Sequence, residues 1–255
     1  MENEEINKNH DICFDALKCI KETCESINIP YYLLAGTTLG AVRHGGFIPW
    51  DDDVDGGIRV GDYARFDEEV KKHLPEGFVW TGLPESRNYK YPRMYGKILY
   101  NGRGCVDVFR IAKWPDNAIA RKILWKLRSF FIRGFQVHIY EENRCQTNVN
   151  YFITKVTSKF LTQKFCVKAL RFIEALYEHK KTDYYVNIYS IYVMKKEMIK
   201  SKWLDETSFV NFNGEKFQTV GDTHNYLQNL YGDYMKLPPE SERNKSHEEI
   251  FEIFD

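Results

Sequence analysis

The spacing of hydrophobic residues predicts a mixed α/β unit over the first 111 residues. Apolar side chains recur every three or four positions from about Glu5 to Ile27, which is typical of an amphipathic helix. Short apolar or alternating runs, bounded by glycine, proline or asparagine, predict strands between further helices. In chain order we expect a strand over 31–35, a helix over 37–44, a strand over 53–60, a helix over 62–74 with Asp62 as its N-cap, and strands over 78–81, 94–100 and 105–111.

The pattern changes after Pro115 and becomes mainly helical up to residue 181. Apolar residues over 161–176 follow one another at the three- and four-residue steps of one helix face. Nearer the end, Asn213-Gly214 separates two strand-like runs and predicts a hairpin, which a short helix over 222–230 follows. We therefore expect one region over 1–115, and a mainly helical region with a short hairpin over 116–255 that packs on it.

The composition excludes several classes of protein. The 255 residues include 36 basic and 36 acidic side chains, whereas a protein that coats nucleic acid needs an excess of lysine and arginine. The acidic start, Met1 to Glu5, lacks the basic and apolar segments of a signal peptide, and no run approaches the length, about 18 apolar residues, that spans a bilayer. Six cysteines without a C-x-x-C pair indicate free thiols. We expect a soluble, cytoplasmic protein that does not bind nucleic acid.

Four carboxylates stand within five residues, at Asp51, Asp52, Asp53 and Asp55. On a strand, Asp53 and Asp55 would project from the same face about 7 Å apart. Asp51 would extend that row, and Asp52 would point the other way. Oxygen ligands of this kind favour a hard divalent cation, Mg²⁺ or Mn²⁺, and the absence of interleaved histidine and cysteine disfavours zinc. The alternative is a solvated acidic surface loop.

A turn from strand to helix at Gly36 and Thr37 precedes the acidic run. Backbone N–H groups at a helix start attract phosphate, so the turn and the metal ligands together predict phosphoryl or nucleotidyl transfer. Asp107, a lone acid in an apolar strand, is the candidate for a third ligand or for the group that accepts the proton of the attacking hydroxyl. The alternative is an edge-strand aspartate that faces water. Three residues could bind a diphosphate, or could lie on the surface or pair with the aspartates instead: Arg43, His44 and Lys97.

At these residues the sequence resembles the LicD family, the phosphorylcholine transferases of bacterial surface polysaccharides, and it is similar to the catalytic core of fukutin and fukutin-related protein. The resemblance rests on three segments in order along the chain: 33–55 (LLAGT, then RHGGFIPWDDDVD), 106–109 (VDVF) and 231–239 (YGDYMKLPP). The middle of the chain, about 116 to 205, carries little of it.

The resemblance implies a nucleotidyltransferase-like fold, in which a Gly-Thr turn and an acidic strand hold nucleotide phosphates and Mg²⁺. Asp53, Asp55 and Asp107 would then be the catalytic and metal-ligating carboxylates. Asp51, which extends the acidic row, is a further candidate ligand and the alternative to Asp107 as the group that accepts the hydroxyl proton. The implied activity is the transfer of a phospho-alcohol, typically phosphocholine from CDP-choline, to the hydroxyl of a glycan or lipid-linked glycan, with release of CMP. Relatives use other CDP-linked alcohols such as CDP-ribitol.

The identity of the alcohol is open. Two places near the expected pocket differ from the usual family pattern, Gly57 and the segment 110–112. If the alcohol is choline, its quaternary ammonium favours an aromatic face, and Trp50 beside the metal ligands is the candidate. The alternative is that Trp50 packs against Pro49.

Residues 113–133 combine six basic side chains with a single acid, Asp116, and four interleaved aromatic residues. Such a helix can lie on the inner, anionic leaflet of a membrane, where a lipid-linked glycan acceptor would be presented. The alternative is an ordinary helix with one core face and one solvated face.

Two other functions remain as alternatives to phospho-alcohol transfer. The first is a nucleotidyltransferase that moves NMP onto an alcohol, a small molecule or a protein and releases pyrophosphate. The second is an inactive protein that binds carbohydrate or nucleotide, which the presence of Asp53, Asp55 and Asp107 disfavours.

Overall fold

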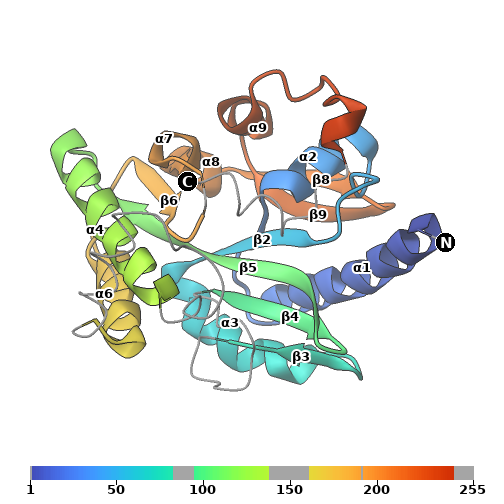
Figure 1. Ribbon diagram of the computed structural model, residues 1–255, viewed down its shortest axis with the longest axis horizontal. Coiled ribbons are helices and arrows are strands. Elements are labelled where there is room, and N and C mark those ends of the chain that lie inside the picture. The colour runs from blue at the N-terminus through green and yellow to red at the C-terminus, as the bar shows by residue number, and fades with distance from the viewer. Residues whose placement is uncertain (1, 83–94, 138–160, 191, 244–255) are drawn as a thin grey trace. The chain divides into compact units, whose positions relative to one another are not determined.

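The computed structural model describes residues 2–82, 95–137, 161–190 and 192–243, and Figure 1 shows its helices and strands along the chain. The protein forms two compact units. The first comprises residues 1–82, 96–109 and 202–255, and the second comprises residues 83–95 and 110–201. Both units are discontinuous in sequence, whereas the hydrophobic pattern predicts a single division near residue 115.

The first unit is built on a mixed sheet. Its strands are β1 (Tyr32–Leu33), β2 (Val54–Arg59), β3 (Phe78–Trp80), β4 (Gly96–Tyr100), the first part of β5 (Arg103–Trp114), β8 (Thr207–Phe212) and β9 (Glu215–Val220). They lie in the order β3-β4-β5-β2-β1-β9-β8. β1 runs parallel to β9, while the pairs β1–β2, β3–β4, β4–β5 and β8–β9 are antiparallel. This order places β2 beside β5, and these strands carry candidate acidic residues.

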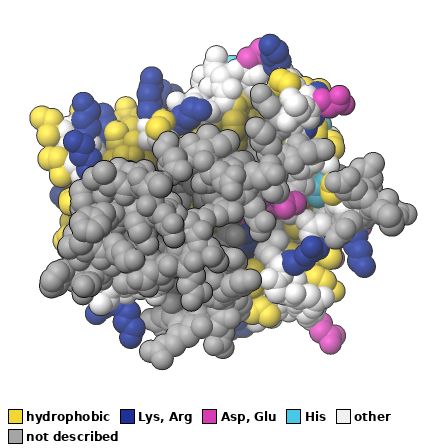
Figure 2. Space-filling view, in the orientation of Figure 1, with side chains coloured by type: hydrophobic (Ala, Val, Ile, Leu, Met, Phe, Trp, Pro, Cys, Tyr) yellow, Lys and Arg dark blue, Asp and Glu magenta, His cyan; other side chains and the backbone are white. Residues whose placement is uncertain are grey.

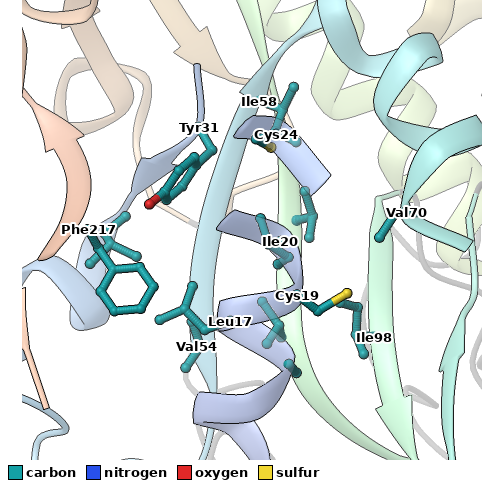
Figure 3. Packing of buried hydrophobic residues seen from close by; sticks show 14 of the residues in the cluster. Leu17, Cys19, Ile20, Cys24, Tyr31, Val54, Ile58, Val70, Ile98 and Phe217 are labelled. Carbon is teal, nitrogen blue, oxygen red and sulfur yellow. The ribbon is translucent and has the colours of Figure 1, made fainter. Parts of the chain in front are cut away.

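Helices α1 (Glu2–Ser26) and α3 (Val60–His73) share one hydrophobic core with the strands of this unit. On α1, the buried Leu17 lies beside Val54 of β2, and Cys24 lies beside Ile58 of the same strand (Figure 3). The apolar face that predicts the first helix is therefore the face that covers the sheet. The other helices with residues in this unit are α2 (Ala35–His44), α8 (Ser201–Asp205), α9 (Thr223–Tyr231) and a 3-10 helix, Glu240–Glu242.

In the second unit, the end of β5 pairs antiparallel with β6 (Tyr184–Asn187), and β6 pairs antiparallel with β7 (Met198–Lys200). The described helices here are α4 (Ala118–Val137), α6 (Gln163–Ala175) and α7 (Met194–Glu197). A separate core joins α4, α6 and β6 through buried residues such as Leu124, Leu170 and Val186. Residues 138–160, which the sequence also predicts to be helical, lie outside the described residues.

The mixed α/β fold class is confirmed, and so is the hairpin. Asn213 and Gly214 join β8 to β9 with φ values of 50° and 85°, as the favoured two-residue hairpin turn requires. One local prediction is wrong: Asp62 lies in the first turn of α3, because the helix begins earlier and Arg59 occupies the N-cap position. β6 and β7 lie in the region expected to be mainly helical, and strands of four and three residues are too short to leave a clear alternating pattern.

Candidate active site

Three of the predicted ligands converge where β2 lies beside β5. Asp55 lies on β2, Asp53 directly precedes that strand, and Asp107 lies on β5. One carboxylate oxygen from each residue lies within 4.8 Å of the other two. Asp107 is buried, and the other two are partly buried. The order of the strands thus brings Asp107 together with Asp53 and Asp55, which are far from it along the chain.

Asp53 also belongs to a second group, with Asp51 and Asp52, whose carboxylate oxygens lie within 4.8 Å of one another. If side chains alternated here as in a strand, that of Asp52 would point away from those of Asp51 and Asp53. Residues 51–53 precede β2 and are not part of it, so Asp52 stays within reach although it is exposed. The two groups share one residue, which makes Asp53 the centre of the acidic segment.

Two residues of α1 that sequence reasoning missed hold this segment in place. The Asn9 Nδ2 donates to the Asp52 carbonyl oxygen at 2.6 Å, and the His10 Nε2 lies 2.6 Å from the Asp51 carbonyl oxygen. A side chain that bonds to a distant backbone carbonyl leaves no signal in local patterns, because any residue supplies that acceptor. These two contacts of α1 therefore hold the backbone of the acidic segment.

Burial makes the negative charges of this site costly. Loss of solvent, and next the charge of Asp53, raises the pKa of Asp51 to about 8. Burial, followed by the charges of Asp53 and Asp107, raises the pKa of Asp55 well above its usual value. A cation among these groups would offset the repulsion that raises the pKa values. The donor atoms are all carboxylate oxygens, which fits a hard divalent ion such as Mg²⁺ or Mn²⁺.

Lys97 lies against the same carboxylates. Its Nζ is 2.7 Å from the Asp107 Oδ1, and the two residues face each other in the register of β4 and β5. A Cβ atom at Gly104 would come within 2.0 Å of the Lys97 Cε, so the glycine leaves room for the lysine side chain. The sequence leaves three roles open for Lys97: binding a diphosphate, a surface position, or an ion pair with an aspartate. The structure shows the ion pair.

The start of α2 borders the acidic segment. A Cβ atom at Gly36 would lie 2.9 Å from the Asp51 Oδ2, so this carboxylate sits against the first turn of the helix. The backbone N–H of Asp55 donates to the Thr37 Oγ1 at 2.7 Å. The first N–H groups of a helix have no acceptor within the helix and favour anions. The predicted phosphate turn and the predicted metal ligands are therefore neighbours.

Arg43 and His44 lie at the opposite end of α2, a helix of 10 residues and so about 15 Å in length. The Arg43 Nη1 donates to the carbonyl oxygen of Tyr234 at 2.9 Å. Burial, and next the charge of Arg43, lowers the pKa of His44, which favours a neutral imidazole. The structure does not place these two side chains beside Gly36 and Thr37.

Trp50 lies between a histidine and an arginine. Its ring is nearly perpendicular to that of His44, with the centroids 6.1 Å apart, and the Arg243 guanidinium lies 5.2 Å from the indole centroid. The indole is therefore already in contact with a cation. Next to it, a cavity of about 440 Å³ is lined by Ile6, His10, His44, Gly46, Phe47, Pro49 and Asn213.

The sequence of this chain is similar to those of known proteins. Residues 28–130 match the family model for the nucleotidyltransferase domain of LicD, FKTN and FKRP. The lipopolysaccharide cholinephosphotransferase LicD of Haemophilus influenzae is 26% identical over 92% of this chain and 93% of its own length. The ribitol 5-phosphate transferase FKRP of Homo sapiens is 31% identical over 43% of this chain and 23% of its own length. The chain thus spans nearly all of the bacterial relative and less than a quarter of the human one.

These findings confirm the resemblance that the motifs indicate. The matched residues include every predicted site residue, from Gly36 to Asp107. Both relatives are named as transferases of a phosphate-linked alcohol, which agrees with the predicted class of enzyme, a phosphotransferase. Residues 28–130 of this chain therefore match the nucleotidyltransferase domain of the LicD family.

Proposed function

We propose that this protein is a metal-dependent transferase that moves a phospho-alcohol from a CDP-alcohol to a glycan hydroxyl and releases CMP. The observation that carries the proposal is the group formed by Asp53, Asp55 and Asp107, whose oxygens lie within 4.8 Å of one another. The bacterial relative, which is matched over most of its length, is named a cholinephosphotransferase. We therefore expect CDP-choline as the donor, with CDP-ribitol as the next candidate. A cytoplasmic location is part of the proposal.

Asp53, Asp55 and Asp107 would hold a Mg²⁺ or Mn²⁺ ion, and Asp51 would lie outside this set of ligands. When bound, such an ion would offset the negative charge on the oxygens of the donor diphosphate. A donor set of closely spaced carboxylate oxygens supports a hard divalent ion over zinc.

Residues of the chain would orient the donor and accept a proton. Gly36 and Thr37, at the start of α2, would bind a donor phosphate through backbone N–H groups. The glycan hydroxyl oxygen forms a bond to the phosphorus nearer the alcohol, while the bond between that phosphorus and the oxygen of CMP breaks. The hydroxyl proton passes to a carboxylate. Because Asp107 is engaged by Lys97, we assign this proton to Asp51.

The remaining candidates have different parts in this proposal. Lys97 positions Asp107 and does not bind the diphosphate, because its Nζ is already 2.7 Å from that carboxylate. Arg43 and His44, at the far end of α2, and Trp50 are candidates for contacts with the nucleoside, which CDP-choline and CDP-ribitol share.

Product analysis tests the proposal. The purified chain is incubated with Mg²⁺, glycan acceptors and a panel of CDP-choline, CDP-ribitol and CDP-glycerol. We expect acceptor-dependent release of CMP with at least one donor, which EDTA stops and which Asp53→Asn lowers by about 100-fold or more. Asp15→Asn removes a carboxylate from an exposed position of α1 and serves as the control.

Three outcomes would contradict phospho-alcohol transfer. The first is turnover that Asp53→Asn leaves unchanged, and the second is no CMP release with any donor of the panel. The third is release of pyrophosphate from a nucleoside triphosphate, which would instead support the transfer of NMP by the same fold.

A further inference from the structure

Helix α4 of the second unit has a buried face and an outward face. Leu124 and Ile132 belong to the core of this unit. On the opposite side, four large apolar side chains at helical steps of four, four and three are exposed by 70%, 54%, 42% and 47%: Ile119, Ile123, Leu127 and Phe130. Single exposed apolar residues are ordinary, but a continuous row of four along one helix marks a surface that contacts something apolar.

A basic row runs beside this apolar row. Lys122, Lys126 and Arg133 are exposed at steps of four and seven, so they line one edge of it. The two other basic residues of α4 turn elsewhere: Arg121 donates to the carbonyl oxygen of Asp116, and Arg128 is buried and donates to the carbonyl oxygen of Ile188. The sequence of α4 contains no acidic residue. Its outward charge is therefore entirely positive.

The space-filling view agrees with this description. In Figure 2, yellow hydrophobic and dark blue basic side chains lie together at the upper left, near the end of α4 that Figure 1 places there. We call the apolar row and the basic row together the α4 face.

Exposed aromatic and basic side chains also lie on α6, the helix that packs against α4 in this unit. The Phe130 ring lies 5.3 Å from that of Phe131, which lies 6.0 Å from the Phe165 ring of α6. Phe165 is 51% exposed, and Lys164 and Lys168 on α6 are exposed as well. Aromatic and basic side chains thus lie together on the surfaces of two helices that pack against each other.

We propose that the α4 face docks on the anionic surface of a lipid bilayer. The interface of such a bilayer accommodates both rows, because apolar side chains enter the acyl boundary while lysine and arginine contact lipid phosphates. A second copy of the chain would bring an identical positive row against the first. None of the described helices is long and apolar enough to cross a membrane, so α4 would lie in the plane of the interface. This inference does not depend on the proposed function.

Vesicle sedimentation with the full chain tests the inference. The probes are vesicles of phosphatidylcholine alone and vesicles that also contain phosphatidylglycerol. We expect binding to the anionic vesicles only, and weaker binding as salt rises. Lys122→Glu/Lys126→Glu should lower the affinity about 25-fold or more, since each charge near the surface contributes about fivefold. Ile123→Ser/Leu127→Ser should lower it by a similar factor.

Matched variants control for charge and for apolar surface. Lys71→Glu/Lys72→Glu makes the same change of charge on α3, and Val79→Ser/Phe209→Ser removes two other exposed apolar side chains. Both control variants should bind as the unchanged chain does, and thermal unfolding verifies that all variants are folded. The inference is overturned if the unchanged chain does not bind anionic vesicles at low salt, binds neutral vesicles equally well, or loses no affinity in the two α4 variants. A dimer in sedimentation velocity that Ile123→Ser/Leu127→Ser dissociates, without vesicle binding, would overturn it in favour of a second copy.

Discussion

The Nζ of Lys97 lies 2.7 Å from the Oδ1 of Asp107, across the paired strands β4 and β5. The lysine side chain is 10% exposed and the aspartate side chain 5%, so this ion pair occupies the buried end of the carboxylate group. A fixed positive charge here offsets part of the repulsion among the aspartates and fixes one oxygen of Asp107. The pair therefore belongs to the architecture of the site.

Replacement of Lys97 by methionine removes this charge while keeping much of the side chain. We expect the free energy of unfolding to fall by about 3 kcal/mol or more, because Asp107 is left buried without its partner. Chemical denaturation measures the change. Lys21→Met is the matched control: its ion pair with Glu215 is 24% and 43% exposed, and its loss should cost less than about 1 kcal/mol. Equal costs for the two variants would contradict a buried, structural pair.

Gly104→Ala tests the same pair from the other strand. The new Cβ would come within 2.0 Å of the Lys97 Cε, so the flexible end of the lysine must leave its place beside Asp107. We expect a folded protein whose turnover falls by about 10-fold to 100-fold, as is typical when a group that orients a ligand is displaced. Gly56→Ala is the control, because its Cβ would meet its nearest atom, the Asp107 carbonyl oxygen, at an ordinary 3.7 Å. If Gly104→Ala and Gly56→Ala have equal turnover, the position of the Lys97 side chain does not affect activity, which would contradict the prediction.

Much of the first unit could be predicted from sequence because each element has a pattern of its own. The apolar face of α1 and the Asn213-Gly214 turn act locally, and both appear where expected. Contacts between distant segments could not be predicted in this way. The pairing of Lys97 with Asp107 depends on the register of two strands, and His10 reaches a backbone carbonyl 41 residues away.

The free energy of unfolding of the protein should depend on pH because of Glu197, a buried residue of the second unit. Burial raises the pKa of this carboxyl from 4.5 to about 7, although Ser190 donates to it and Arg128 is nearby. Between these two values the native state holds a proton that the unfolded chain has lost. Raising the pH through this range therefore destabilises the fold, by up to about 3 kcal/mol.

The Glu197→Gln variant isolates this effect. Its free energy of unfolding should match that of the unchanged chain near pH 4.5 and exceed it by up to about 3 kcal/mol at pH 8. Urea denaturation across this range measures the difference. Glu178→Gln, which changes a less buried glutamate of the same unit, should run parallel to the unchanged chain. A constant offset between Glu197→Gln and the unchanged chain would contradict the prediction.

Trp50 provides a test of how the donor alcohol is bound. Because the Arg243 guanidinium already lies 5.2 Å from the indole centroid, we expect Trp50 to have no special role toward a quaternary ammonium. Trp50→Leu should then change the KM for CDP-choline and for CDP-ribitol by similar factors. Steady-state kinetics with both donors measures this. An increase confined to CDP-choline, and of about 10-fold or more, would show that choline does bind the indole.

Titration calorimetry with Mg²⁺ and Mn²⁺, in the presence of CDP-choline, tests the account most directly. The closely spaced oxygens of Asp53, Asp55 and Asp107 predict that the unchanged chain and Asp15→Asn bind a divalent ion, and that Asp53→Asn does not. Absence of metal binding to the unchanged chain, or undiminished binding to Asp53→Asn, would contradict it.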